Sequence, residues 1–174
     1  MKDNFDTSFE RVMRSEGGYV WDKDDAGGET NLGVTVGAWG SYLGRAVEPG
    51  EMKALTLADV EPFYRRMDWD TVRCDDLPAG VDYAVFDFAV NAGPGRAARF
   101  LQGAVGGLAD GAVGPGTLAL VAEADPAAVL QKFARRKEEF YNGLAKSNPT
   151  QQKFLRGWLN RVAGVQTVAS SMLA

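Results

Sequence analysis

The sequence predicts a mainly helical protein of the α+β class, with one small β-hairpin lobe near its N-terminus. Apolar residues recur at helical spacing through most of the 174 residues. A turn-rich segment, Asp-Asp-Ala-Gly-Gly at 24–28, separates two short apolar stretches, which is typical of a hairpin. With 45% hydrophobic and 24% charged residues, the chain has an ordinary globular composition and enough length to bury a core.

The first element is expected to be a helix over residues 7–15. Thr7 and Glu10 have the spacing of a capping box at its start, and Gly17-Gly18 would end it. Residues 19–36 then predict a hairpin-like or irregular β segment.

The remainder is expected to be almost entirely helical. Pro62 is too far inside its helix for a first turn, so that helix should begin nearer Asp59. The stretch 78–91 is apolar on nearly every side, as a helix at the centre of a domain would be. The predicted helical segments are 37–55 (with loops), 57–69, 78–91, 94–105, a helix from Pro115, 126–145 and 150–172.

The composition excludes several classes of chemistry. The chain has no histidine and one cysteine, Cys74, which argues against Ser-His-Asp, Cys-His and zinc-dependent catalysis and against an internal disulfide. No metal or organic cofactor is therefore expected. The net charge of −4 argues against nucleic-acid binding and a polybasic membrane anchor. No apolar run is long enough for membrane insertion, and the N-terminus lacks the apolar core of a secretory signal.

Without an imidazole, acid–base chemistry near neutral pH would fall to a carboxyl group or a lysine. Glu16 is the best candidate, because it follows the first predicted helix. The partial negative charge at a helix C-terminus disfavours a second negative charge, and so favours the protonated acid. The alternative is a solvated glutamate before a glycine stop.

A carboxylate and a hydroxyl follow across the predicted hairpin. Asp25 comes nine positions after Glu16, and Thr30 comes five after Asp25. A hairpin folded back over the helix end would bring them opposite Glu16, an arrangement that inverting glycosidases use to hold a water. The alternative is that Asp25 forms a turn and Thr30 is a strand residue.

The segment EGGYVWDKDDAGGETNLGVT (16–35) resembles the signature of glycoside hydrolase family 108, a family of N-acetylmuramidases found among phage endolysins and bacterial secretion activators. It is also similar to the wider phage-lysozyme pattern, with four residues rather than five between Asp25 and Thr30. The resemblance implies a lysozyme-like two-lobed fold, Glu16 as general acid, and Asp25 and Thr30 as the residues that position water. Inversion and retention both stay open.

Two downstream segments extend the resemblance. DLPAGVDYAVFDFAVNAGPGRAARFLQ (76–102) is similar to the central helix of these enzymes, and implies that Asn91 contacts the N-acetyl group of a sugar. DGAVGPGT (110–117) and KFLRGWLNRV (153–162) resemble a predicted peptidoglycan-binding domain, although turn and helix-start chemistry alone also explains 110–117. The expected organisation is a hydrolase region, 6–92, and a helical binding region, 93–174, packed as one compact unit.

The predicted function is hydrolysis of the β-1,4 bond between N-acetylmuramic acid and N-acetylglucosamine in peptidoglycan. Substrate contacts are expected from Tyr19, Trp21, Asn31 and Asn91. The expected setting is a monomeric endolysin, made in a host cytoplasm and released to the wall by a separate holin-type protein. Two alternatives stay open: a lytic transglycosylase, and a non-catalytic peptidoglycan-binding module that helps secretion.

Overall fold

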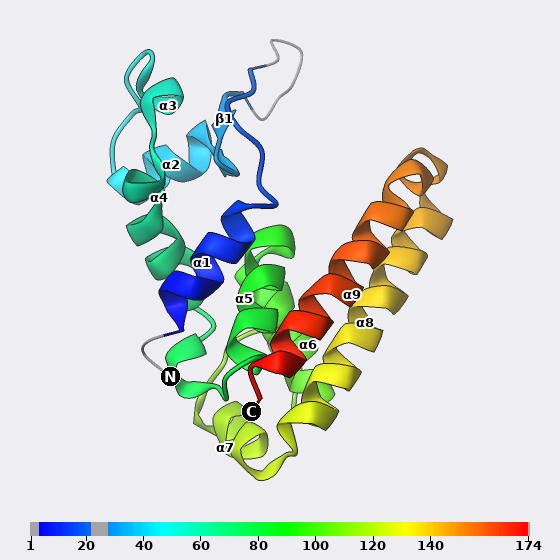
Figure 1. Ribbon diagram of the computed structural model, residues 1–174. Coiled ribbons are helices and arrows are strands. Elements are labelled where there is room, and N and C mark those ends of the chain that lie inside the picture. The colour runs from blue at the N-terminus through cyan, green and yellow to red at the C-terminus, as the bar shows by residue number, and fades with distance from the viewer. Residues whose placement is uncertain (1–3, 22–27, 174) are drawn as a thin grey trace. The chain divides into compact units, whose positions relative to one another are not determined.

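The computed structural model describes residues 4–21 and 28–173 (Figure 1). Contacts divide the chain into two compact units, one of Phe5–Met67 and one of Asp68–Ala174 with Met1–Asn4. Most described residues are helical, and the strands form one small antiparallel hairpin, which confirms the predicted fold class. None of the described helices is long and apolar enough to cross a membrane.

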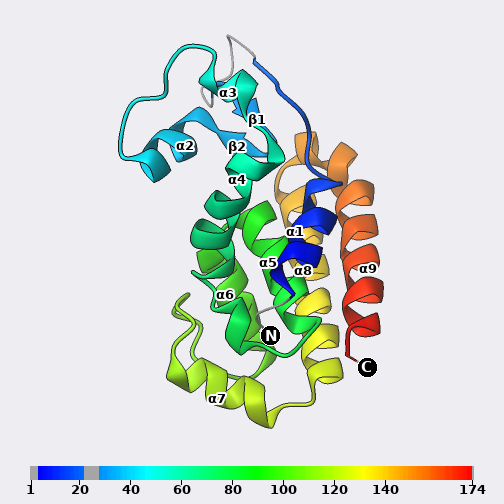
Figure 2. The same cartoon turned by 60° about the vertical axis from the view of Figure 1, so that its left-hand side comes forward.

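The N-terminal unit consists of short helices around the hairpin, and Figure 2 shows strand β2 leading directly into α2. Its elements are α1 (Phe5–Met13), β1 (Thr30–Asn31), β2 (Val34–Thr35), α2 (Val36–Leu43), α3 (Glu51–Ala54) and α4 (Leu57–Tyr64), followed by a π-helical turn (Arg65–Trp69) that crosses into the second unit.

Helix α1 begins two residues earlier than predicted. Phe5 is buried and its ring stacks on that of Phe9, with centroids 5.8 Å apart, so the apolar stripe starts one turn sooner. Thr7 therefore lies inside the helix, and the predicted capping box with Glu10 is wrong. The helix ends at Met13, before the predicted Ser15.

Two adjacent turns build the hairpin. Val20 forms an isolated antiparallel bridge with Thr30, so the two residues flank the predicted turn-rich segment. Strands β1 and β2 then pair through a second, two-residue turn at Leu32-Gly33. Both turn residues have positive φ, 49° and 78°, as a type I′ turn requires. The sequence pattern predicts the first reversal but not the second.

Helix α4 begins at Leu57, the first residue of the predicted segment 57–69, and not nearer Asp59 as the position of Pro62 suggested. Thr56 and Asp59 form a capping box in which the Thr56 backbone N–H donates to Asp59 Oδ2 at 2.8 Å. The hydrogen bonds from Thr56 lower the pKa of Asp59. This cap stabilises the start of α4, and Pro62 is accommodated inside the helix just before the π-helical turn.

The second unit is a helical bundle built around α5, and Figure 1 shows α8 and α9 running side by side in opposite directions. Every residue of α5 from Val81 to Ala89 is buried, as predicted for 78–91. Prolines occupy the first turns of α6, α7 and α8. The elements are a 3₁₀ turn (Cys74–Asp76), α5 (Val81–Ala92), α6 (Pro94–Ala104), α7 (Pro115–Glu123), α8 (Pro126–Ser147), a second 3₁₀ turn (Pro149–Phe154) and α9 (Leu155–Ser171).

An ion-paired cluster lies inside this bundle. The Asp87 carboxylate on α5 accepts from Lys137 Nζ on α8 at 3.1 Å and from Arg161 Nε on α9 at 2.9 Å. The Asp87 and Lys137 side chains are each only 3% exposed. Burial lowers the pKa of Lys137, and the Asp87 carboxylate opposes that shift. One carboxylate therefore links three helices of the core.

Asp68, in the π-helical turn, is a buried carboxyl group whose pKa is raised by desolvation to about 7. Between pH about 4 and 7 the unfolded chain loses a proton that the folded protein keeps, so the free energy of unfolding should fall as pH rises, by about 1.4 kcal/mol per unit of pKa difference. Asp68→Asn should therefore match wild type near pH 4 and be more stable at pH 7.5. Urea unfolding of both proteins across this range tests this, and parallel curves would contradict it.

Candidate active site

Glu16 lies in the turn that follows α1. The backbone N–H groups of Ser15 and Glu16 donate to the carbonyls of Val12 and Met13. These are i→i−3 hydrogen bonds of the 3₁₀ type, which wind the helix end more tightly than the i→i−4 bonds of an α-helix. The Glu16 side chain is half-buried. The sequence predicts Glu16 at the C-terminal end of the first helix. In the structure, α1 ends about one turn before Glu16.

The Glu16 carboxyl group is next to the hairpin turn. A Cβ added to Gly33 would stand 2.8 Å from Glu16 Oε2 and 2.6 Å from the hydroxyl oxygen of Tyr64. Both oxygens therefore lie against the bare α-carbon of one glycine. Only glycine leaves room for them, and only glycine adopts its φ of 78° without strain.

Tyr64 holds the turn in place. Its hydroxyl donates to the carbonyl of Leu32 at 2.8 Å, and its ring is buried at the end of α4. Leu32 has a positive φ of 49°, which costs a residue with a Cβ of the order of 1–2 kcal/mol and persists only where neighbours enforce it. Tyr64 and Gly33 are site residues that the sequence analysis missed. Gly33, between the two short strands, was a signal for the turn, but no local pattern pointed to Tyr64.

The chain that leaves Glu16 lies along β1. Val20 and Thr30 exchange two backbone hydrogen bonds, of 2.8 and 2.9 Å, and Thr30 is half-buried. Asp25 lies outside the described residues, so its predicted position opposite Glu16 is not tested. Glu29, beside Thr30, is a further carboxylate that the sequence analysis did not single out.

Aromatic side chains stand exposed next to this strand pair. Trp21 is 56% exposed and Tyr19 is 36% exposed. Partial desolvation raises the pKa of Tyr19, and the hydrogen-bonded Glu29 carboxylate raises it further. Large exposed rings with polar neighbours are the side chains on which sugar rings stack.

The two predicted asparagine contacts differ in their surroundings. Asn31 is buried, and its amide nitrogen donates to the carbonyl of Met52 at 2.8 Å, which ties β1 to α3. Asn91 is exposed at the end of α5, where its side-chain oxygen accepts from the hydroxyl of Tyr141. Burial, followed by the charge of Asp87, raises the pKa of Tyr141 to about 12, so its hydroxyl stays a donor. Asn91 belongs to the second unit, whereas Glu16 belongs to the first.

A mainly helical chain with a small N-terminal hairpin has the fold of the lysozyme-like class. Residues 9–93 match the family model described as Glycosyl hydrolase 108, and residues 96–163 match the Predicted Peptidoglycan domain. The chain is similar to the solved structure of Brucella abortus SagA, with 36% identity, a TM-score of 0.87, and coverage of 99% of this chain and 97% of that one. No match is found among the curated proteins.

The chain belongs to glycosyl hydrolase family 108, which confirms the resemblance identified from residues 16–35 and 76–102. It is an N-acetylmuramidase-type glycosidase whose substrate is peptidoglycan. Among the described residues, no group of three or more His, Cys, Asp or Glu side chains is placed to hold a metal ion.

The family matches and the compact units divide the chain at different points. The boundary between the two family matches lies between residues 93 and 96. The boundary between the two compact units lies between residues 67 and 68. Helix α5 therefore falls in the hydrolase match and at the centre of the second unit. The expected division into 6–92 and 93–174 stays a prediction.

Gly33→Ala is expected to lower kcat/KM on peptidoglycan by about tenfold or more, since a methyl group would displace Glu16 and Tyr64 from the turn. It should also destabilise the fold by about 1–2 kcal/mol through its positive φ. Turbidity assays on cell walls and thermal unfolding measure the two effects.

Gly37→Ala is the matched control for this variant. Gly37 lies in α2, and a Cβ there would meet nothing within 4 Å. Alanine should preserve activity there and stabilise the helix slightly. Equal activity of the Gly33 variant and this control would show that the turn does not position Glu16.

Proposed function

We propose that Glu16 is the general acid, which protonates the oxygen between N-acetylmuramic acid and N-acetylglucosamine. The observation that carries this assignment is the position of its carboxyl group, half-buried against Gly33 and beside the Tyr64 hydroxyl. A general acid must be fixed within hydrogen-bonding distance of the leaving oxygen, and the packing of the half-buried Glu16 carboxyl group against Gly33 supports this role.

Asp25, with Thr30, takes the second role in this proposal, which is to orient water or to stabilise the oxocarbenium-like transition state. The bridge between Val20 and Thr30 supports this role for Thr30, because it brings β1 alongside the chain that leaves Glu16. The separation of the two carboxyl groups would decide between inversion and retention.

Sugar rings stack on Trp21 and Tyr19, whose exposed rings follow Glu16 within five residues. Asn91 donates its amide N–H to an N-acetyl carbonyl, since its side-chain oxygen is already engaged by Tyr141. Asn31 acts as a positioning residue, because its amide nitrogen is buried against the carbonyl of Met52. It therefore affects the substrate by holding the hairpin in position, and not by contacting the substrate directly.

The setting that we propose is that of a phage endolysin, which acts as a monomer and reaches the wall through a separate holin-type protein. Such an enzyme needs no export signal of its own. Expression with and without a holin in a sensitive host tests this: lysis should require both proteins, and lysis by the enzyme alone would contradict it.

Mass spectrometry of muropeptides released from purified peptidoglycan tests the reaction. Hydrolysis yields reducing N-acetylmuramic acid ends with one oxygen from solvent, so digestion in H₂¹⁸O should label them. Anhydromuramyl ends without label would identify a lytic transglycosylase and contradict the water-positioning role. Intact glycan together with retained wall binding would identify the protein as a non-catalytic peptidoglycan-binding module and contradict the proposed hydrolysis.

A further inference from the structure

A groove with a strongly positive lining runs between α6 and α8 of the second unit. It has a volume of about 390 Å³ and is lined by the small residues Gly103, Ala104 and Gly106 on α6 and its end, and by Lys132, Arg135, Arg136 and Glu139 on α8. Its lining thus carries three cationic side chains and one anionic one, in a chain whose net charge is −4. The groove contains none of the residues assigned to the candidate active site.

The charges in the groove are not balanced. Arg135 Nε donates to Glu139 Oε1 at 3.1 Å, so the only carboxylate in the lining is already engaged. Within the described part of the chain, Lys132 and Arg136 make no ion pair or hydrogen bond. They are one helical turn apart on α8, where like charges repel each other. The groove therefore carries two uncompensated positive charges.

The position of Arg136 depends on Gly103. A Cβ on Gly103 would stand 2.5 Å from the Arg136 guanidinium carbon, so this side chain lies directly against the backbone of α6. A glycine inside a helix costs about 0.5–1 kcal/mol relative to alanine, and close packing of another group is the usual reason to keep one. The Arg136 guanidinium thus lies at the α6 wall of the groove, where its planar set of donors can meet an anion.

We propose that this groove binds a free carboxylate of the peptide stems of peptidoglycan. Arg136 is the bidentate hydrogen-bond donor to this carboxylate, and Lys132 supplies a second positive charge beside it. A planar guanidinium matches a carboxylate, and the neighbouring ammonium adds a point charge. The stems carry free carboxylates at the isoglutamyl residue and at the D-alanine terminus unless these are amidated. The identity of the ligand rests on the proposed function, since peptidoglycan is the substrate of the Glu16 site.

The test uses the full chain and a synthetic stem tetrapeptide with free carboxylates, titrated by calorimetry at low salt. The tetrapeptide should bind wild type, and its fully amidated form should bind about tenfold more weakly or worse. The double variant Lys132→Gln/Arg136→Gln should show a similar loss. These side chains are exposed, so the variant should keep the wild-type melting temperature.

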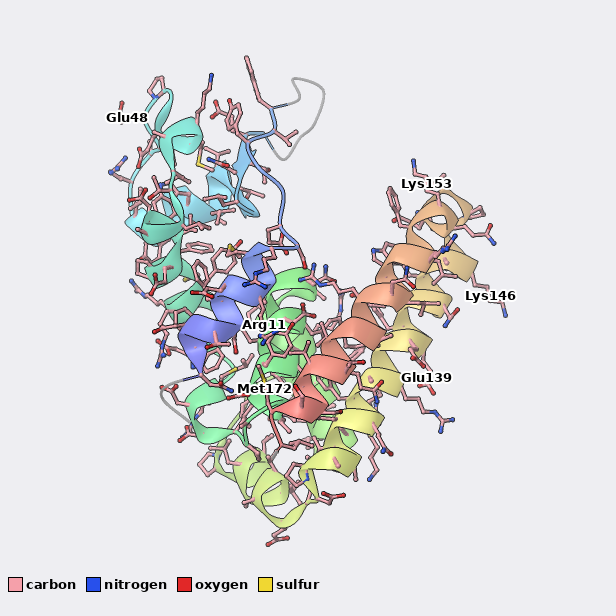
Figure 3. All side chains as sticks on the ribbon, in the orientation of Figure 1. Arg11, Glu48, Glu139, Lys146, Lys153 and Met172 are labelled. Carbon is pink, nitrogen blue, oxygen red and sulfur yellow. The ribbon has the colours of Figure 1, made fainter. Side chains whose placement is uncertain are left out.

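Lys146→Gln is the control, because it removes a positive charge from α8 outside the groove. Figure 3 labels Lys146 and the groove residue Glu139, which both extend outward from this helix. It should bind the tetrapeptide as wild type does. Equal binding of the free and amidated peptides, no loss in the double variant, or tighter binding of inorganic phosphate than of the tetrapeptide would each overturn the proposal.

Cleavage and binding assays distinguish failure of the stem-binding proposal from failure of the proposal that Glu16 is the general acid. The double variant should cleave stem-free glycan, prepared with an amidase, at the wild-type rate. Glu16→Gln should bind the tetrapeptide normally but cleave glycan about 10²–10⁴-fold more slowly than wild type. Slow cleavage of stem-free glycan by the double variant would show that the groove residues act on the glycan site, and would overturn the stem-carboxylate assignment.

Discussion

Glu16→Gln should lower kcat on peptidoglycan by about 10²–10⁴-fold, because an amide cannot donate a proton to the leaving oxygen. Glutamine has nearly the same shape, so the contacts with Gly33 and Tyr64 should persist and wall binding should be retained. The measurement is the release of reducing ends from purified peptidoglycan, with sedimentation of the protein with walls as the binding readout.

Glu10→Gln is the appropriate control for Glu16→Gln. It neutralises an exposed carboxylate on α1, two turns before Glu16, and changes the net charge equally. Its activity should equal that of wild type. Substantial cleavage by Glu16→Gln, at more than about a tenth of the wild-type rate, would show that another group supplies the proton.

Asp87→Asn should destabilise the second unit by about 3–5 kcal/mol, because it leaves the Lys137 cation buried without a counter-charge. Part of this loss should be recovered at high pH, since burial lowers the pKa of Lys137 and the variant removes the opposing carboxylate. Chemical denaturation at pH 7 and pH 9.5, relative to wild type, measures both effects.

Arg135→Gln provides the comparison for Asp87→Asn, since it breaks an ion pair on the same helix α8. Arg135 and Glu139 are 81% and 64% exposed, so their pair should contribute no more than about 1 kcal/mol. The double variant Asp87→Leu/Lys137→Met should restore much of the lost stability. Equal stability of Asp87→Asn and wild type would mean that Lys137 is neutral in the native state.

The helical segments of the second unit were predictable because their signals are local. Proline marks the first turn of α6, α7 and α8, and the apolar composition of 78–91 indicated the buried α5. The errors came from interactions that a local pattern does not contain. The stacking of Phe5 on Phe9 lengthened α1, and a capping box with Asp59 set the start of α4 before Pro62.

The candidate site was predictable in part for the same reason. Glu16 stands within a motif of consecutive residues, so the role proposed for it could be inferred from the resemblance. Tyr64 reaches the same turn from a helix that begins 41 positions after Glu16 along the chain, at Leu57, and only the tertiary structure reveals that contact. Asn31 was expected at the substrate, but its side chain is buried against the Met52 carbonyl.

The position of α5 bears on how parts of this enzyme can be exchanged. A chimera joined at residue 93, where the family matches change, would take the central helix of the bundle from one parent and its packing partners from another. A junction at residues 67 and 68 would transfer α5 together with Lys137 and Arg161, the partners of its Asp87. Recombination at that earlier point should therefore yield soluble hybrids more often.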